Sequence, residues 1–335
     1  MRRKVRNVGI VLETRDDALA VGRPLSHLYH WREPEEIEAV TGALAGLGFV
    51  PRLLGTPAQV AQRLDAVRGE VDFVFNISVG FVTRYRMALG PSLYALAGLP
   101  YSGADPYGKL VSQNKQLTYG LLGALGLPVP GWRYCDRVED AQRLEARAYP
   151  AIVKPAWEGA SIGLEADAVV RDAGSLRALA RRLIETLGMP VIVQDFIRGR
   201  ELKVGILGDA PTLFEGILED TGADGSAMGD RFLYFDAKKQ GAFGKRRVDS
   251  GQPGMAALLA DCRRIYRLLA PLDYATFDVR VDEAGRHYFL EVNADATLHP
   301  RRTLAECCRL NGLDYRGLID AIMRSAFARQ DLTRA

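Results

Sequence analysis

The chain has 335 residues, of which 48% are hydrophobic and 25% charged, so it can form two or three domains with substantial cores. Its 44 basic and 41 acidic residues leave a formal net charge of +3, which argues against a nucleic-acid partner. The apolar run VGIVL is too short for a signal peptide or a membrane span, and the four cysteines form no C-x-x-C pair. We therefore expect a cytoplasmic protein with reduced structural cysteines, no membrane partner and small-molecule substrates.

The first hundred residues alternate strand-like and helix-like runs. VGIVLE, VPRLLG and VDFVFNIS have the composition of strands, and EPEEIEAVTGALAGLG and TPAQVAQRLDAVRG lie between them with helical periodicity. Helix starts are marked by Glu-Pro-Glu-Glu and by Thr56-Pro57, and a helix stop by Gly48. This βαβαβ order predicts a parallel sheet with helices on its faces.

The pattern changes after residue 111. SQNKQLTYGLLGALGLPVPGW predicts a helix from about Ser112 to a stop at Gly126, followed by a domain junction. AIVKPAWEGASIGL then predicts a strand and a glycine-containing loop, SLRALARRLIETLG a helix, and PVIVQDFIRGRELKVGILGD two strands around Arg198-Gly199. Residues 220–253 are rich in Gly, Asp and Lys with weak periodicity, which predicts a long loop that could act as a lid.

A β-hairpin is predicted over ATFDVRVDEAGRHYFLEVN, with a two-residue turn at Ala284-Gly285. This register places Asp278 directly opposite Glu291. One face of the hairpin is then apolar, with Phe277, Val279, Val281, Tyr288, Leu290 and Val292. The other face carries Asp278, Arg280, Glu291 and Asn293.

Three oxygen-bearing side chains, those of Asp278, Glu291 and Asn293, thus converge at one end of the hairpin. Such a set suits Mg²⁺, which takes a few carboxylates and completes its shell with phosphate oxygens and water. The alternative is a solvated salt-bridge network in which Asp278 and Glu291 pair with Arg280. Like charges directly opposite one another are destabilising, which argues against two unliganded carboxylates at this place.

Lys154 ends an apolar strand and opens the loop KPAWEGASIGL. Gly159 and Gly163 let backbone amides approach a ligand closely, and Ser161 can donate a hydroxyl hydrogen bond. A lysine followed by such a loop fits a phosphate group, although surface Lys-Pro turns are common. The spacing matches neither the P-loop nor the dinucleotide fingerprint.

Four segments in this order and spacing resemble the ATP-grasp fold, and specifically its D-alanine–D-alanine ligase branch: NKQLTYGLLGALGLPVP, AIVKPAWEGASIGL, VIVQDFIRGRELKVGILG and FDVRVDEAGRHYFLEVN. The resemblance runs from about Val71 to the C-terminus and is strong from Asn114 to Asn293. It implies a mixed α/β and α+β protein with an N-terminal pre-ATP-grasp domain (1–106) built on the parallel sheet. A central ATP-grasp subdomain (107–195) and a C-terminal subdomain (196–335), which carries the lid and the metal site, would enclose ATP.

The same resemblance implies roles for individual residues. Lys115 and Lys154 would contact the phosphates, and the loop from Glu158 to Gly163, with Gly159 and Ser161, would close over them. The rest of the nucleotide would be bound by Gln194, Asp195, Phe196 and Ile197, whose backbone reads the adenine edge, and by Glu201 at the ribose. Asp278, Glu291 and Asn293 would hold two Mg²⁺ ions, for which Mn²⁺ could substitute. Lys238 in the lid would contact phosphate, and Lys154, Lys238 and Ser161 would form the catalytic set.

In the reaction that the family implies, a carboxylate attacks the γ-phosphate to form an acyl phosphate. An amine then displaces phosphate, which yields an amide and ADP. The residues match these needs, because lysines and metal ions neutralise charge on the phosphoryl group and a closing lid excludes water.

The substrate positions depart from the family pattern. Thr276 stands where the family has an arginine, two residues before the metal-binding aspartate. Arg84 and Arg86 replace acidic residues, and they could clamp a carboxylate-rich substrate or simply begin a solvated helix. Ala160 replaces a serine. Asp295 lies where the family has a Pro-Gly turn, and it could hold a substrate ammonium or cap a helix near Thr303.

Three further side chains have open roles. His27 and His30 are spaced for a metal pair, but they equally suit packing or a substrate wall. Trp157 fits either a lid-packing residue or a substrate wall.

The main hypothesis is an ATP- and Mg²⁺-dependent carboxylate–amine ligase that acts on an amino acid or a similar compound in specialised metabolism. One alternative is a D-alanine–D-alanine ligase with unusual substrate contacts, and another is a non-catalytic nucleotide-binding module. The partners would be a small-molecule carboxylate and an amine, and the resemblance suggests a homodimer.

Overall fold

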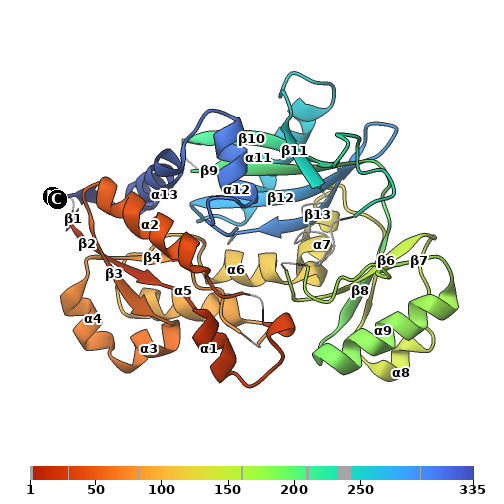
Figure 1. Ribbon diagram of the computed structural model, residues 1–335, viewed down its shortest axis with the longest axis horizontal. Helices are drawn as coiled ribbons and strands as arrows, with labels where there is room; N and C mark the ends of the chain where they lie inside the picture. Colours follow the sequence, from red (N-terminus) through yellow and green to blue (C-terminus); the bar gives the residue numbers. More distant parts are fainter. Residues whose placement is uncertain are drawn as a thin grey trace.

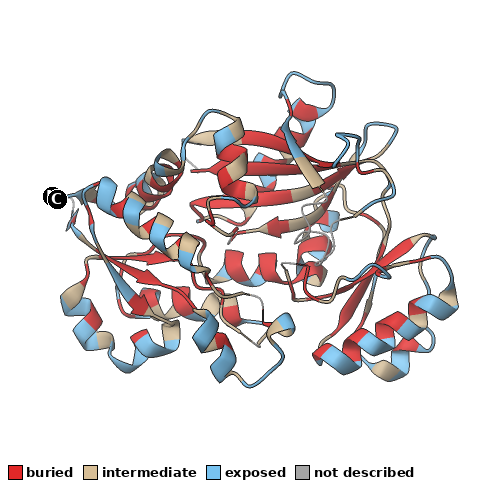
Figure 2. Cartoon of the chain, viewed as in Figure 1, coloured by how far each residue is buried: buried red, intermediate tan, exposed pale blue. Residues whose placement is uncertain are grey.

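The computed structural model describes residues 3–28, 30–81, 83–159, 161–208, 211–232, 243–294 and 296–335. Within these ranges the chain forms an N-terminal sheet, a small sheet and a large sheet, and its two ends pair with each other (Figure 1). The strands are largely buried, whereas the helices expose their outer faces (Figure 2). Lys238, Asp295 and Ala160, which were discussed above, lie outside the described residues.

The N-terminal sheet is parallel, as predicted, with strand order β3-β2-β4. Its strands are β2 (Asn7–Val11), β3 (Val50–Gly55) and β4 (Phe73–Asn76). The helices of this region are α1 (Arg15–Ala20), α2 (Pro34–Gly46), α3 (Pro57–Gln62), α4 (Leu64–Glu70) and α5 (Arg86–Leu96). The single helix predicted over TPAQVAQRLDAVRG (56–69) is therefore wrong in part, since Arg63 (φ −130°, ψ 34°) separates α3 from α4.

The small sheet is antiparallel, with strand order β5-β8-β6-β7. Its strands are β5 (Trp132–Cys135), β6 (Ala151–Pro155), β7 (Val169–Val170) and β8 (Val191–Asp195). The predicted helix is α9 (Ala173–Leu187), which shares an apolar core with the strands and ends at Gly188, where φ is 65°. A left-handed residue suits glycine because it has no Cβ. The short helix α8 (Val138–Ala141) completes this unit.

The large sheet has the strand order β11-β10-β9-β12-β13, and every neighbouring pair is antiparallel. Its strands are β9 (Arg200–Leu207), β10 (Phe214–Gly222), β11 (Phe243–Arg247), β12 (Tyr274–Val281) and β13 (His287–Asn293). The long loop predicted over residues 220–253 is thus wrong in part, because Asp220 belongs to β10 and residues 243–247 form its partner β11. Residues 233–242 lie outside the described ranges.

Helices join the sheets. α11 (Met255–Leu268) packs on one face of the large sheet, and α6 (Pro106–Gln113) and α7 (Lys115–Ala124) lie centrally in Figure 1. The helix predicted from Ser112 begins at Lys115 instead, because the Asn114 side chain accepts hydrogen bonds from Gln116 N (3.0 Å) and Leu117 N (3.3 Å) and caps α7.

The C-terminal helices return to the N-terminal sheet. α12 (Thr303–Leu310) and α13 (Tyr315–Arg329) share its apolar core, where the Phe327 ring packs edge-on against Phe49 and Phe73 at 5.9 and 5.4 Å. β1 (Arg3–Val5) pairs with β14 (Leu332–Arg334), so the chain ends meet. The division into domains at residues 106 and 195 stays a proposal. The separate sheets support it, but α12 and α13 of the predicted C-terminal subdomain share a core with the N-terminal sheet.

The hairpin β12–β13 has the predicted pairing at its functional end, with Asp278 opposite Glu291. The register shifts after Asp278, so that Val279 pairs with Phe289 and a β-bulge holds Leu290. The two-residue turn predicted at Ala284-Gly285 is wrong, because Val281 pairs with His287 and not with Tyr288. The apolar face predicted for Tyr288 and Leu290 is wrong for the same reason. Phe289 packs in the core in their place, together with Phe277, Val279, Val281 and Val292.

Candidate active site

A cavity of about 490 Å³ lies where the small sheet, the large sheet and the N-terminal region meet. Its walls include most of the predicted nucleotide positions: Lys115, Lys154, Glu158, Gly159, Ser161, Gln194, Phe196, Ile197 and Glu201. The three predicted metal ligands line it too, together with Arg86 and Thr276. Asp195 and Arg84 are not among the lining residues, so the structure brings together all but two of the predicted residues that it describes.

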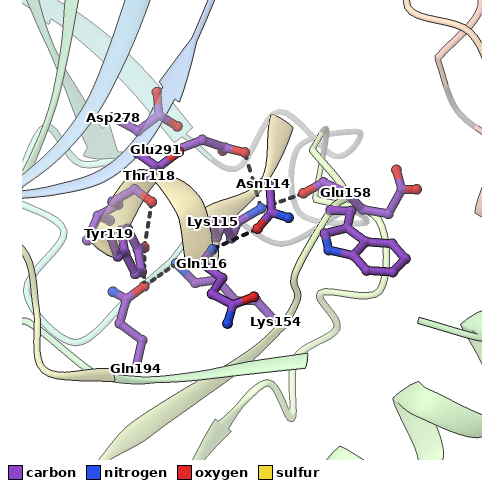
Figure 3. A network of polar contacts seen from close by, with 12 residues as sticks. Asn114, Lys115, Gln116, Thr118, Tyr119, Lys154, Glu158, Gln194, Asp278 and Glu291 are labelled. Atoms are coloured by element: carbon purple, nitrogen blue, oxygen red, sulfur yellow. Dashed lines mark hydrogen bonds and ion pairs between the residues drawn. The ribbon is translucent and has the colours of Figure 1, made fainter. Parts of the chain in front are cut away.

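Lys115 and Lys154 enter the cavity from different elements, as Figure 3 shows. The cap at Asn114 places Lys115 at the first position of α7, and its ammonium donates to Glu158 O at 2.5 Å and contacts Glu291 Oε1 at 3.3 Å. Lys154 extends from β6 and donates to Gln194 Oε1 at 3.0 Å. Burial, followed by the neighbouring Lys115 charge, lowers the pKa of Lys154 to about 8. Two ammonium groups in one buried cavity are suited to a polyanion.

The loop of residues 155–164, here called the glycine loop, connects β6 to the rest of the small sheet. Ile162 N donates to Gly159 O and Leu164 N to Ser161 O, each at 3.0 Å. Ser161 has φ 62°, a left-handed conformation that is uncommon for a residue with a side chain and that clusters at functional sites. At Gly163 (φ 71°) a Cβ would lie 2.8 Å from Pro155, so glycine is required there.

The segment predicted to bind adenine leads from β8 to β9. Asp195 N and Phe196 N already donate to Gly131 O (2.8 Å) and Pro150 O (3.1 Å), so these two amides are satisfied within the protein. Phe196 and Ile197 line the cavity. Burial raises the pKa of Asp195, whose carboxylate lies close to Gly131 and outside the cavity wall. Of the three residues whose backbone was predicted to read the adenine edge, Phe196 and Ile197 lie at the cavity wall and Asp195 does not.

Glu201, predicted to bind the ribose, is buried on β9 and bonded to two cations. Its Oε2 accepts from Arg280 at 2.7 Å and its Oε1 from Lys203 at 2.9 Å. Arg280 is buried as well, so the solvated network of Arg280 with Asp278 and Glu291 is not what forms. The partner of Arg280 is Glu201.

The carboxylates of Asp278 and Glu291 each face a lysine. Asp278 Oδ2 accepts from Lys203 at 2.8 Å. Glu291 Oε1 lies 3.3 Å from Lys115, as Figure 3 shows. Burial raises the pKa of Glu291, but the Lys115 and Lys154 charges outweigh it and hold that pKa below its ordinary value. Burial raises the pKa of Asp278 more than Lys203 lowers it. Glu291 is therefore the more firmly ionised of the two.

These carboxylates fit the predicted metal site by their chemistry. Asp278, Glu291 and Asn293 supply hard oxygen atoms on one wall of the cavity. No cluster of three His, Cys, Asp or Glu side chains suited to a metal occurs in the described part of the chain. Two carboxylates and an amide therefore suit an ion that takes further ligands from a nucleotide phosphate.

A buried cluster beside Lys115 joins the glycine loop to the N-terminal region. Glu158 Oε2 lies 2.5 Å from His30 Nε2 and 3.1 Å from Arg86 Nη2. Burial, then the Arg86 charge, lowers the pKa of His30. Burial raises the pKa of Glu158, but the His30 hydrogen bond and the Arg86 charge bring it below its ordinary value. We call His30, Arg86 and Glu158 the loop-anchor cluster.

The cluster changes three expectations. Arg86 begins α5, but it is buried and not solvated, and its guanidinium already pairs with Glu158. Arg84 is exposed and lies 6.0 Å from the Trp157 ring, outside the cavity wall. His30 bonds within the cluster, whereas His27 ends a short 3₁₀ helix (Leu25–His27), so the two do not form a metal pair. Trp157 does line the cavity.

Sequence reasoning missed several charged residues of the site. Lys203 follows Glu201 by two residues in RELKVGIL, and this spacing on a strand could have revealed that both face the cavity. Asp220 is buried beside them, at the end of β10. Glu36 accepts from Thr297 Oγ1 (3.0 Å) and Leu298 N (2.8 Å) and so anchors the turn after β13. No local pattern pairs residues so distant in the sequence.

Replacement of Arg86 by methionine should weaken ATP binding by about tenfold. The change leaves the buried Glu158 carboxylate without its guanidinium, and breaking a buried ion pair costs about 3–5 kcal/mol. Opening of the glycine loop would relieve part of that cost. The ATP dissociation constant, measured by calorimetry, checks this, with Arg182→Met as the control because Arg182 pairs with Asp167 on the surface. Equal ATP affinity in the two variants would contradict the anchoring role.

Among the described residues, no helix combines the length and the apolar character needed to cross a membrane.

A family model described as the C-terminus of D-Ala–D-Ala ligase matches residues 121–324. A D-alanine–D-alanine ligase of Gluconobacter oxydans is 32% identical over 236 residues, which is 69% of this chain and 74% of that protein. One from Aquifex aeolicus is 28% identical over 232 residues, with 69% and 75% coverage. An uncharacterised protein of Sinorhizobium fredii, y4sG, is 26% identical over 259 residues, with 76% and 75% coverage.

Solved structures resemble the chain over nearly its whole length. A D-alanine–D-alanine ligase of Bacillus anthracis in complex with ATP superposes with a TM-score of 0.69 at 16% identity, covering 97% of this chain and 98% of that one. The VanG D-Ala:D-Ser ligase of Enterococcus faecalis gives 0.70 at 16% identity, with 97% and 100% coverage. At this identity the likeness establishes the fold.

Proposed function

The chain belongs to the D-alanine–D-alanine ligase family, and from that premise we propose that it joins an amino acid or a similar carboxylate to an amine. The proposed pair of substrates is not D-alanine with D-alanine. It has the ATP-grasp fold that the sequence predicted, and it is an ATP-dependent, ADP-forming ligase. The observation that carries the proposal is a contrast between the phosphate positions and the substrate positions. Lysines and carboxylates remain where phosphates and metal would bind, whereas Thr276 lines the cavity in place of the family arginine and Arg86 pairs with Glu158.

In the proposed reaction the residues of this chain bind, orient and shield the reactants. Lys115 and Lys154 hold the phosphates of ATP and offset the charge on the transferring phosphoryl group. The glycine loop covers the phosphates and keeps water from the acyl phosphate, and Ser161 within it donates to a phosphate oxygen. Phe196 and Ile197 border the adenine, and Glu201 accepts from the ribose. The role of Lys238, a further phosphate contact, stays a prediction.

We also propose that Asp278, Glu291 and Asn293 hold Mg²⁺ ions, which Mn²⁺ could replace. Support comes from their hard oxygen atoms on one wall of the cavity and from the lysines that keep the carboxylates charged. When bound, such ions neutralise charge on the β- and γ-phosphates. Asn293 lies opposite Thr276 across β12–β13, so the metal site borders the position where the family arginine is missing.

A D-alanine–D-alanine ligase is the second candidate, favoured by the names of the relatives. ADP release in the presence of paired amino acids separates the two. We expect turnover with a pair other than D-alanine alone, and strong turnover with D-alanine as the only amino acid would reject the first proposal. Membership of the ligase family already argues against the non-catalytic nucleotide-binding module, and amine-dependent ADP release of any kind would be direct evidence against it.

We further propose a homodimer that works in the cytoplasm. Large apolar side chains are exposed at the start of α5 and along α5, α6 and α7, namely Tyr85, Leu89, Leu96, Tyr107, Leu110 and Leu117. Exposed apolar surface of this kind marks interaction sites, and the mass in solution decides between monomer and dimer. The cytoplasm supplies ATP and keeps the four buried, unpaired cysteines reduced.

A further inference from the structure

The floor of the cavity contains a buried lysine that the reaction above leaves without a role. The side chain of Lys203, on β9, is only 7% exposed. Its ammonium donates to Asp278 Oδ2 at 2.8 Å and to Glu201 Oε1 at 2.9 Å, and it lies 3.7 Å from Asp220 Oδ2. One cation thus joins carboxylates from three adjacent strands of the large sheet.

The strand register explains this convergence. Lys203 lies directly opposite Asp278 on β12, and Glu201 is two residues earlier on the same face of β9. Glu201 and Asp220 each have a second cation, since Arg280 donates to Glu201 at 2.7 Å and Lys245 to Asp220 at 3.1 Å. For Asp278, Lys203 is the cation in hydrogen-bonding contact among the described residues.

We propose that Lys203 is a positioning residue for the metal site. Its ammonium binds one oxygen of Asp278, fixes the carboxylate plane and leaves the second oxygen for a divalent ion. It also links Asp278, at the metal, to Glu201, at the ribose, and so fixes the position of the metal site relative to the ribose site. This inference rests on the proposed function, because it takes the metal ligands from there.

Two physical arguments support this role. Asp278 and Glu291 lie directly opposite one another, and like charges in this arrangement repel unless a cation offsets them. A carboxylate that binds a metal is normally oriented by a partner behind it, and loss of that partner typically weakens metal binding by about 10–100-fold. A merely structural ion pair would leave metal affinity unchanged in a protein that stays folded.

The test measures Mn²⁺ binding in the presence of a non-hydrolysable ATP analogue, with free Mn²⁺ quantified by electron paramagnetic resonance. We expect Lys203→Met to weaken Mn²⁺ binding by about 10–100-fold and Lys203→Arg to restore most of it, because arginine keeps the charge and the donor. Lys245→Met is the matched control, since it removes a cation from the same network without a contact to Asp278. We expect its effect to stay below about threefold, well under the loss of an outer partner.

Folding is checked by thermal unfolding and by metal-free binding of the analogue, and Lys203→Gln replaces the methionine variant if that one is unfolded. Mn²⁺ affinity within about threefold of the unmodified protein, or tighter binding, would overturn the role of Lys203 and leave the metal site standing. An unmodified protein that binds no Mn²⁺ with the analogue would overturn the metal site as well.

Discussion

Glu291→Gln should reduce ADP release by about 10³-fold or more and leave the fold intact. The glutamine side chain has nearly the same shape but no negative charge. A metal at a phosphoryl group contributes several kcal/mol, and about 1.4 kcal/mol corresponds to a tenfold change in rate. Glu291 is the carboxylate whose pKa the lysines Lys115 and Lys154 keep low, so its charge is in place at neutral pH.

The assay measures steady-state ADP release, and circular dichroism and thermal unfolding verify the fold. Glu283→Gln is the matched control, because Glu283 lies in the exposed turn of the same hairpin. We expect that control to behave like the unmodified protein. An active Glu291→Gln enzyme would remove Glu291 from the metal site and leave the ligase assignment, which rests on the family, unaffected.

Lys154→Met should lower kcat/KM for ATP by about 10²–10³-fold, the usual effect of removing one preorganised group that stabilises developing negative charge. The lysine is buried beside Lys115 and hydrogen-bonded to Gln194, so its ammonium is held in place at the end of β6. Kinetics at varied ATP concentration measure the effect. Lys4→Met is the control, because Lys4 is exposed. Lys109→Met is not suitable, because Lys109 is itself buried.

The low pKa of Lys154 makes this prediction dependent on pH. In the free protein the ammonium loses its proton as pH rises through about 8, so ATP affinity should fall across that range. Bound phosphate favours the charged form and raises the pKa again, so ATP binding at pH 8 should take up protons from solution. Calorimetry in buffers of different ionisation enthalpy detects this uptake. Lys154→Arg should abolish it, because arginine stays protonated.

Much of the fold could be predicted because its signals are local. Hydrophobic periodicity located β2, β3, β4, α2 and α9, and the parallel N-terminal sheet followed from their order. The two errors in the helices occurred at single residues. Asn114 caps α7, so this helix begins at Lys115, three residues beyond the expected start. The non-helical backbone of Arg63 interrupts the helix predicted over residues 56–69.

The candidate site likewise contains contacts that the sequence predicts and contacts that it does not. Asp278 and Glu291 lie opposite one another as predicted, but the predicted turn does not produce this pairing. Val281 pairs with His287, one residue away from the expected register, and the bulge at Leu290 restores the register at Asp278. The contacts of Arg86 were not predictable, since Glu158 is 72 residues away in the sequence. Burial turned an expected surface or substrate-binding arginine into one half of an internal ion pair. Lys203 was overlooked although its spacing from Glu201 carried a usable signal.

The bulge at Leu290 bears on how this protein can change in evolution. Phe289 and Val292 both reach the core although they are three residues apart, an odd spacing that a regular strand would place on opposite faces. Leu290 absorbs the difference. Substitutions on β13 outside the core and the metal site therefore leave the strand register unchanged, whereas loss or gain of a single residue would rotate either Phe289 into the cavity or Glu291 into the core. Relatives that keep this chemistry should differ in the amino acids of β13 and not in the number of its residues.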